Sequence, residues 1–111
     1  MKKSNILEPI NPGEILLDDF LVPLGISINQ LSRDISVPPN RISEIVNGKR
    51  SITADTALRL QRYFGVEAQF WLNLQTEYDL RMMKRKIWDD IEQRIIPVIR
   101  TDETIQHRVG A

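Results

Sequence analysis

The 111-residue sequence contains no cysteine, which excludes a disulfide scaffold and any zinc site that needs a thiolate ligand. The same absence is typical of a protein that works in a reducing cytoplasm. No run of about 18 apolar residues is present, so the sequence predicts no membrane span. The opening residues MKKSNILE lack the apolar core of a secretory signal. We therefore expect one modest cytoplasmic domain.

The sequence also has few of the groups that catalysis uses. Its single histidine, His107, lies in a polar C-terminal stretch, and neither a glycine-rich phosphate loop nor a HisGluXaaXaaHis motif occurs. Two acidic pairs, Asp18-Asp19 and Asp89-Asp90, are adjacent in sequence, and side chains of neighbouring residues on a helix point apart. We therefore expect no enzyme activity, no cofactor and no metal site.

The chain has no net charge, with fifteen basic and fifteen acidic side chains, which argues against generic binding of polyanions. The charges are nevertheless sorted along the chain. Residues 4–32 contain four acids and no base, whereas residues 33–62 contain six bases and three acids. A local basic excess is expected of a small DNA-binding protein, although a chance distribution of solvated charge would look the same.

The apolar pattern between residues 28 and 50 predicts two short helices joined by a tight turn. Leu31 and Ile35 lie four residues apart on one helical face, and Ile42 and Ile45 lie three apart on the next. A helix-turn-helix needs such a pattern, because its two helices must bury facing sides against each other. Two amphipathic helices in an ordinary bundle would share the pattern, so periodicity alone leaves both interpretations open.

The residues at the expected helix ends agree with this reading. Ser27 can cap the first helix. Pro39 suits the first turn of the second helix, because that position needs no backbone N–H. Gly48, after Asn47, can take the left-handed conformation that stops a helix. These signals place the turn and the second helix in the stretch with the basic excess.

Three further helices are expected around this pair. One opens at Asn11 and is ended by Pro23 to Gly25, and another follows Thr53 as its cap and ends at Gly65. Residues 66–96 contain neither glycine nor proline, so they could form one long helix or two with a bend. The sequence therefore predicts an all-α fold with a five-helix helix-turn-helix domain and a C-terminal helical extension.

The C-terminal third has apolar residues that a domain this small would leave uncovered. They could fold back on the domain's own core or meet a second copy of the chain. Residues 95–99, with the sequence IIPVI, could form a short edge strand or the collapsed end of a helix. The residues that we expect at a dimer interface are Met83, Ile87, Trp88, Ile91, Ile95 and Val98.

The chain divides accordingly into four parts. Residues 1–10 form an N-terminal arm, and residues 11–80 form the helix-turn-helix domain. Residues 81–100 form the C-terminal extension, for which we expect a role in dimerisation. Residues 101–111 form a polar and flexible tail.

Three motifs follow one another in the sequence: PNRISEIVNGKRSITADTALRL at residues 39–60, FG at residues 64–65 and FWLNLQ at residues 70–75. In this order they resemble the HigA/VapI group of antitoxins, within the Xre/Cro family of helix-turn-helix regulators. The resemblance covers about residues 11–80. It implies a dimeric repressor that binds the double-stranded operator of its own operon and also binds a HigB-type toxin. Such toxins are small basic ribonucleases of the RelE fold that cleave messenger RNA.

The resemblance also implies which residues contact DNA. The base-reading residues are Pro39, Asn40, Arg41, Ser43 and Glu44, of which asparagine, arginine and serine have side chains that can pair with base edges. The phosphate-binding residues are Ser27, Asn29, Lys49, Arg50 and Thr53. A stand-alone Xre-family regulator without a toxin would keep the same DNA-reading residues, and the sequence does not separate the two.

Two positions depart from the wider Xre pattern. Ile28 stands where a phosphate-binding glutamine is common, which puts that phosphate contact in doubt. Ser36 stands where glycine often makes the turn. A residue with a Cβ atom can take the left-handed conformation there only at some cost in free energy.

Overall fold

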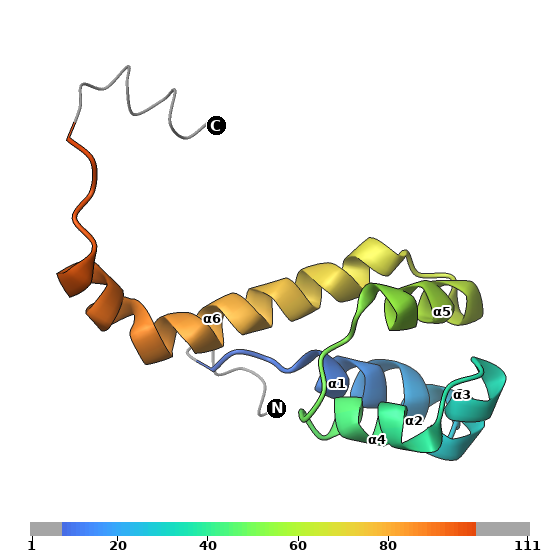
Figure 1. Ribbon diagram of the computed structural model, residues 1–111. Helices are drawn as coiled ribbons and strands as arrows, with labels where there is room; N and C mark the ends of the chain where they lie inside the picture. The colour runs from blue at the N-terminus through green and yellow to red at the C-terminus, as the bar shows by residue number, and fades with distance from the viewer. Residues whose placement is uncertain (1–7, 100–111) are drawn as a thin grey trace.

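Helices are the only regular elements in residues 8–99, which are the part of the chain that the computed structural model describes. A first helical rod is continuous from Pro12 to Leu24, and four separate helices follow it (Figure 1). In chain order the elements are α1 (Pro12–Ile15), the π-helical η2 (Leu16–Leu21), α2 (Val22–Leu24), α3 (Ile28–Asp34), α4 (Pro39–Val46), α5 (Ala54–Phe64) and α6 (Ala68–Arg94). The prediction of an all-α fold with five helices is confirmed.

Three expectations concern the ends of the chain. The possible edge strand at residues 95–99 does not form within the described chain, where this segment is exposed and has no regular secondary structure. The N-terminal arm is described only from Glu8 onward. The tail at residues 101–111, with His107, lies outside the described residues.

The first helical rod passes through Pro23 and ends at Gly25, which has a φ of 68°. Proline lacks the amide hydrogen of an α-helix, and its ring clashes with the carbonyl group four residues earlier. Directly before this position the chain winds into the wider η2, in which the N–H of Val22 bonds to the carbonyl of Leu17. The wider turn separates the proline ring from the preceding carbonyl groups, so the helix continues to α2.

The predicted helix-turn-helix residues lie in the core. Leu31, Ile42 and Ile45 are at most 1% exposed, and Ile35 and Val37 are also buried. Trp71, from the start of α6, is fully buried in the same cluster. The ring of Phe20 lies against the rings of Phe64, Phe70 and Trp71, with centroid distances of 5.0, 6.4 and 4.9 Å. The core therefore joins the first helical rod to α5 and α6 as well as to the helix pair.

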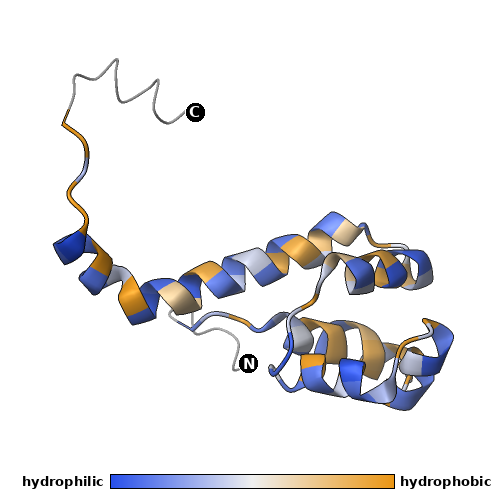
Figure 2. Ribbon diagram, in the orientation of Figure 1, coloured by the Kyte–Doolittle hydropathy of each residue, from blue (hydrophilic) through white to orange (hydrophobic). Residues whose placement is uncertain are grey.

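Residues 68–94 form one helix, which resolves the choice between one helix and two. Its first half packs against α5 and α1. Gln75 is buried there, and its Oε1 atom accepts a hydrogen bond of 2.8 Å from the N–H of Ile52. This bond ties α6 to the linker between α4 and α5. The second half of α6 projects away from the other helices, and Figure 2 shows apolar residues continuing along it and into residues 95–99.

No single helix in residues 8–99 is long and apolar enough to cross a membrane. Two neighbouring helices, Pro12–Leu24 and Ile28–Asp34, reach the required length and composition only when taken together, and they are bent by 93°.

The contact between α1 and α4 depends on Gly13. A Cβ atom built on this residue would overlap the backbone carbonyl of Ile45. The two helices can therefore approach this closely only because the side chain is a hydrogen atom.

Gly13→Ala should lower the free energy of unfolding by about 3 kcal/mol, because the added methyl group must push two backbones apart. Gly25→Ala is the matched control. Its Cβ would meet no atom within 4 Å, so it should cost only the strain of its positive φ, about 1 kcal/mol. Urea unfolding of both variants measures the difference. If both variants lost the same free energy of unfolding, the close approach of α1 and α4 at Gly13 would not explain the cost of Gly13→Ala.

Candidate nucleic-acid interface

Two local side-chain hydrogen bonds shape α3, the first helix of the pair. The Ser27 hydroxyl accepts a bond of 3.0 Å from the N–H of Gln30, so the predicted cap of α3 is present. The Ser32 hydroxyl is buried and donates to the Ile28 carbonyl over 2.9 Å. Thus Ser32 satisfies its polar group within its own helix, and α4 can pack closely against it.

Ser36 adopts the left-handed conformation, with a φ of 60°. It is the only residue other than glycine with a positive φ in the described chain, so the turn keeps its shape without glycine at some cost in strain. A side chain from α5 supports it: Nη1 of Arg59 donates to the carbonyls of Ile35 (2.8 Å) and Ser36 (3.2 Å). No sequence pattern indicates this role of Arg59, because no local pattern links residues 23 or 24 positions apart.

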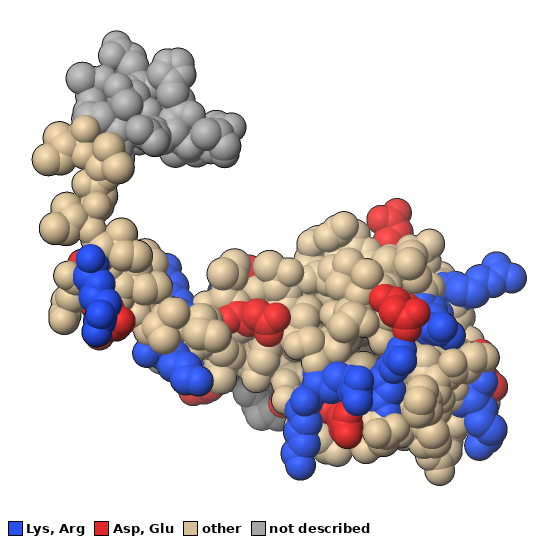
Figure 3. Space-filling model, viewed as in Figure 1, with Lys and Arg blue, Asp and Glu red and all other residues tan. Residues whose placement is uncertain are grey.

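The outward face of α4 carries all five residues that the sequence assigned to base reading. Ile42 and Ile45 point into the core. The side chains of Pro39 and Asn40 are exposed, and those of Arg41, Ser43 and Glu44 are half-buried. Figure 3 shows basic and acidic side chains interleaved over the end of the molecule that carries α3, α4 and α5.

Two of the five side chains are engaged within the chain. Nη1 of Arg41 lies 2.5 Å from Oδ2 of Asp55 at the start of α5. Glu44 accepts from Nε of Arg50 over 2.8 Å, and the Nη2 atom of the same arginine lies 2.7 Å away. Glu44, which is predicted to read bases, is therefore paired with Arg50, which is predicted to hold phosphate.

Asp55 has a specific electrostatic environment. Hydrogen bonds from Arg41 and then Arg59 lower the pKa of its carboxyl group below the usual value of 3.8. The carboxylate is accordingly ionised at neutral pH. It stands in the first turn of α5, where a negative charge also interacts favourably with the helix dipole.

The residues expected to bind phosphates lie around α4 at the surface. Asn29, Lys49, Arg50 and Thr53 are exposed, as is Ser27 at the start of α3. Thr53 occupies the cap position of α5, but its side chain makes no capping hydrogen bond. Ile28 is half-buried against the core, so it packs rather than offering a polar group to DNA.

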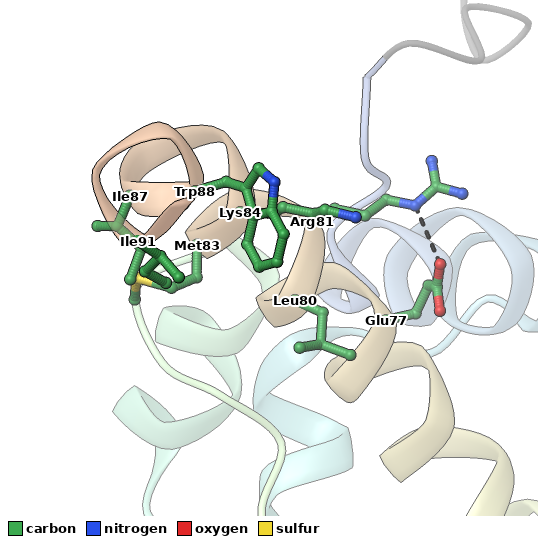
Figure 4. A pocket seen from close by; sticks show the side chains of 8 residues that line it. All are labelled: Glu77, Leu80, Arg81, Met83, Lys84, Ile87, Trp88 and Ile91. Atoms are coloured by element: carbon green, nitrogen blue, oxygen red, sulfur yellow. Dashed lines mark hydrogen bonds and ion pairs between the residues drawn. The ribbon is translucent and has the colours of Figure 1, made fainter. Parts of the chain in front are cut away.

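A second surface lies on the projecting half of α6. Leu80, Met83, Ile87, Trp88 and Ile91 line an open groove of about 530 Å³ (Figure 4). Most of these side chains are more than a third exposed, and the predicted interface residues Ile95 and Val98 are 62% and 57% exposed. The apolar residues therefore do not fold back on the chain's own core, which was the alternative to self-association.

The described residues offer no group of three or more His, Asp or Glu side chains that could hold a metal ion. The chemistry of α4 and its surroundings is that of hydrogen-bond donors and acceptors on an exposed helix. A helix of this kind fits the major groove of DNA, where base edges present complementary donors and acceptors.

Comparisons with known proteins place this arrangement in a family. A helix-turn-helix family model matches residues 18–71. Virulence-associated protein I of Dichelobacter nodosus is 54% identical over 82 residues, which are 74% of this chain and 76% of that protein.

Two solved structures extend the likeness to most of the chain. An addiction module antidote protein of the HigA family from Coxiella burnetii is 47% identical, with a TM-score of 0.77 over 82% of this chain and 99% of its own. Antitoxin HigA of Pseudomonas aeruginosa, solved with the higBA promoter, is 44% identical, with a TM-score of 0.81 over 83% of this chain and 100% of its own.

Ser36→Gly should raise the free energy of unfolding by about 1 kcal/mol, because glycine takes a positive φ without the steric cost of a Cβ atom. Ser36→Ala keeps the Cβ atom and serves as the control, with an expected change within about 0.5 kcal/mol. Thermal or urea unfolding gives both values. If the glycine and alanine variants were equally stable, the strain attributed to this turn would not exist.

Proposed function

Because the chain belongs to the HigA/VapI group of Xre-type helix-turn-helix proteins, we propose that it is the antitoxin of a type II toxin-antitoxin module. In this role it binds the operator of its own operon as a sequence-specific repressor in the cytoplasm. The main support is the 44% identity to a HigA antitoxin that was solved with its promoter. The outward face of α4, with an exposed Asn40 and a half-buried Arg41, adds support from this chain's own residues.

The proposed reading of DNA divides the residues by role. Asn40 makes a bidentate contact with adenine, and Arg41 contacts guanine or a phosphate. Lys49, Arg50 and the backbone N–H groups at the starts of α3 and α5 hold phosphates and set the register. Ser43 and Glu44 contribute weaker contacts, and the Glu44 carboxylate is paired with Arg50 in the free protein.

We propose that a homodimer presents two copies of α4 to successive major grooves, about 34 Å apart, on a palindromic operator. The apolar groove on α6 and the extended residues 95–99 are the surface that a second copy would cover. The support is their exposure in the single chain, because a contiguous apolar surface on a small protein commonly marks an interface.

The second partner in this proposal is a HigB/RelE-like toxin that cleaves messenger RNA. Such a toxin is basic, and the first helical rod carries Glu14, Asp18 and Asp19 but no basic residue. Its charge therefore suits a basic partner. The alternative function is a stand-alone Xre-family regulator without a toxin. Co-purification with the product of a small RelE-like reading frame beside the gene would favour the antitoxin; absence of such a frame would favour the regulator.

Arg41→Ala and Lys49→Ala should change DNA binding in different ways. Loss of Arg41 should weaken operator binding and remove about 1–3 kcal/mol of discrimination at one base position. Loss of Lys49 should weaken binding to all sequences equally and flatten the salt dependence by about 0.9 in log–log slope. Anisotropy titrations against a set of single-base operator variants measure both effects. A changed base preference in Lys49→Ala would contradict the assignment of this residue to phosphate.

Ile87→Glu should convert the dimer to a monomer of 12.9 kDa, because it places a charge inside the apolar groove of α6. Leu24→Glu is the matched control, since Leu24 is also an exposed apolar residue, 59% exposed, but lies on α2. Light scattering after size-exclusion chromatography gives the mass of each variant. A dimeric Ile87→Glu protein, or a monomeric control, would rule out the proposed interface.

A further inference from the structure

Three charged side chains form a cluster that connects the recognition helix α4 to α5 and to the turn. The carboxylate of Asp55 accepts from Nη1 of Arg41 over 2.5 Å and from Nε of Arg59 over 3.2 Å to each oxygen. The guanidinium of Arg59 also holds the Ile35 and Ser36 carbonyls of the turn. Asp55 is therefore an acidic group outside α4 that holds an arginine of the DNA-reading face.

The position of Asp55 creates a competition for Arg41. The side chain of Asp55 is 52% exposed and that of Arg41 is 27% exposed, so the pair lies at the surface that a duplex would approach. Nη1 of Arg41 donates to Asp55 and also lies 3.4 Å from the hydroxyl oxygen of Thr56, so both of its N–H groups are engaged within the chain. A bond from Nη1 to an oxygen of DNA must therefore replace one of these contacts. With Asp55 ionised, the three side chains together carry a charge of +1 instead of the +2 of the arginines alone.

We propose that Asp55 is a specificity-determining residue, which acts on DNA binding through Arg41. It competes with DNA phosphates for the Arg41 guanidinium and so weakens binding to non-operator DNA more than binding to the operator. This inference rests on the proposed DNA-binding function, and it adds a residue that neither the base-reading nor the phosphate-binding assignments include.

The difference between the two kinds of DNA follows from what each offers Arg41. A phosphate is present on every sequence and offers the same charge interaction everywhere. The correct base offers two fixed acceptors to one guanidinium, which compensates for the broken pair with Asp55. Non-operator DNA offers only the phosphate, so on that DNA the competition with Asp55 is not compensated.

The test is Asp55→Asn in the full-length chain. The amide keeps the size of the side chain and removes its charge. Fluorescence anisotropy is measured on two labelled duplexes, one from directly upstream of the gene and one scrambled, at 50 and 200 mM salt. The variant should bind the scrambled duplex more tightly, with a log–log salt slope steeper by about 0.9, as expected for one more neutralised phosphate. The ratio of the variant's affinity for the scrambled duplex to that of the wild type should therefore fall by about 3.5-fold between 50 and 200 mM salt.

Three further variants separate this effect from general charge and from folding. Asp90→Asn makes the same chemical change, and Asp90 also pairs with an arginine four residues on, Arg94, at 2.8 Å. It should leave the ratio of the two affinities unchanged. Asp55→Glu restores the charge and should restore weak binding to the scrambled duplex. In an Arg41→Ala background, Asp55→Asn should have no effect on that duplex, because the competition requires both side chains.

Several results would overturn the proposal. One is that Asp55→Asn binds the scrambled duplex at 50 mM salt no more tightly than the wild type, or too weakly to measure. Another is that Asp55→Asn changes the affinity for this duplex equally in the presence and absence of Arg41. A purely structural role would weaken binding to both duplexes, which is the opposite direction. If the wild type binds both duplexes equally, the proposed operator function fails, while the comparison of variants on the scrambled duplex still decides the role of Asp55.

Discussion

The burial of Ile42 and Ile45 is the constraint on which the rest of the structure depends. α4 has only eight residues, and two buried side chains three positions apart set its rotation about its own axis. Once that rotation is set, Pro39, Asn40 and Ser43 face outward, and Arg41 can reach Asp55 on α5. The close contact at Gly13 then holds α4 against α1, so the outward face is presented by a rigid support.

Local signals predicted most of this arrangement. Apolar periodicity and caps identified the helix pair and the buried face of α4, because both depend on residues a few positions apart. The left-handed turn at Ser36 was indicated by the family resemblance. The ion pair between Arg41 and Asp55, the bonds from Arg59 to the turn and the bond from Gln75 to Ile52 join residues 14 to 24 positions apart. Only the folded chain brings those groups together, so the sequence alone could not indicate them.

The course of the first and last helices was also not fully predictable from local sequence signals. Proline normally ends a helix, and the π-helical turn that carries the chain past Pro23 has no sequence signal of its own. Periodicity allowed either one or two helices in residues 66–96, because neither glycine nor proline marks a break. A single α6 matters for the proposed function. The buried Gln75 anchors its first half to the helix-turn-helix unit, so the packing of its second half in a dimer would set the spacing between two copies of α4.

Two copies of α4 that read a palindrome in successive major grooves should leave a defined pattern in hydroxyl-radical footprinting of the wild-type protein on DNA from directly upstream of the gene. We expect selective protection of two half-sites whose centres are separated by about 10 base pairs, one turn of the duplex, or a multiple of that spacing. Uniform protection along the duplex, or no protection at concentrations that saturate binding, would contradict it.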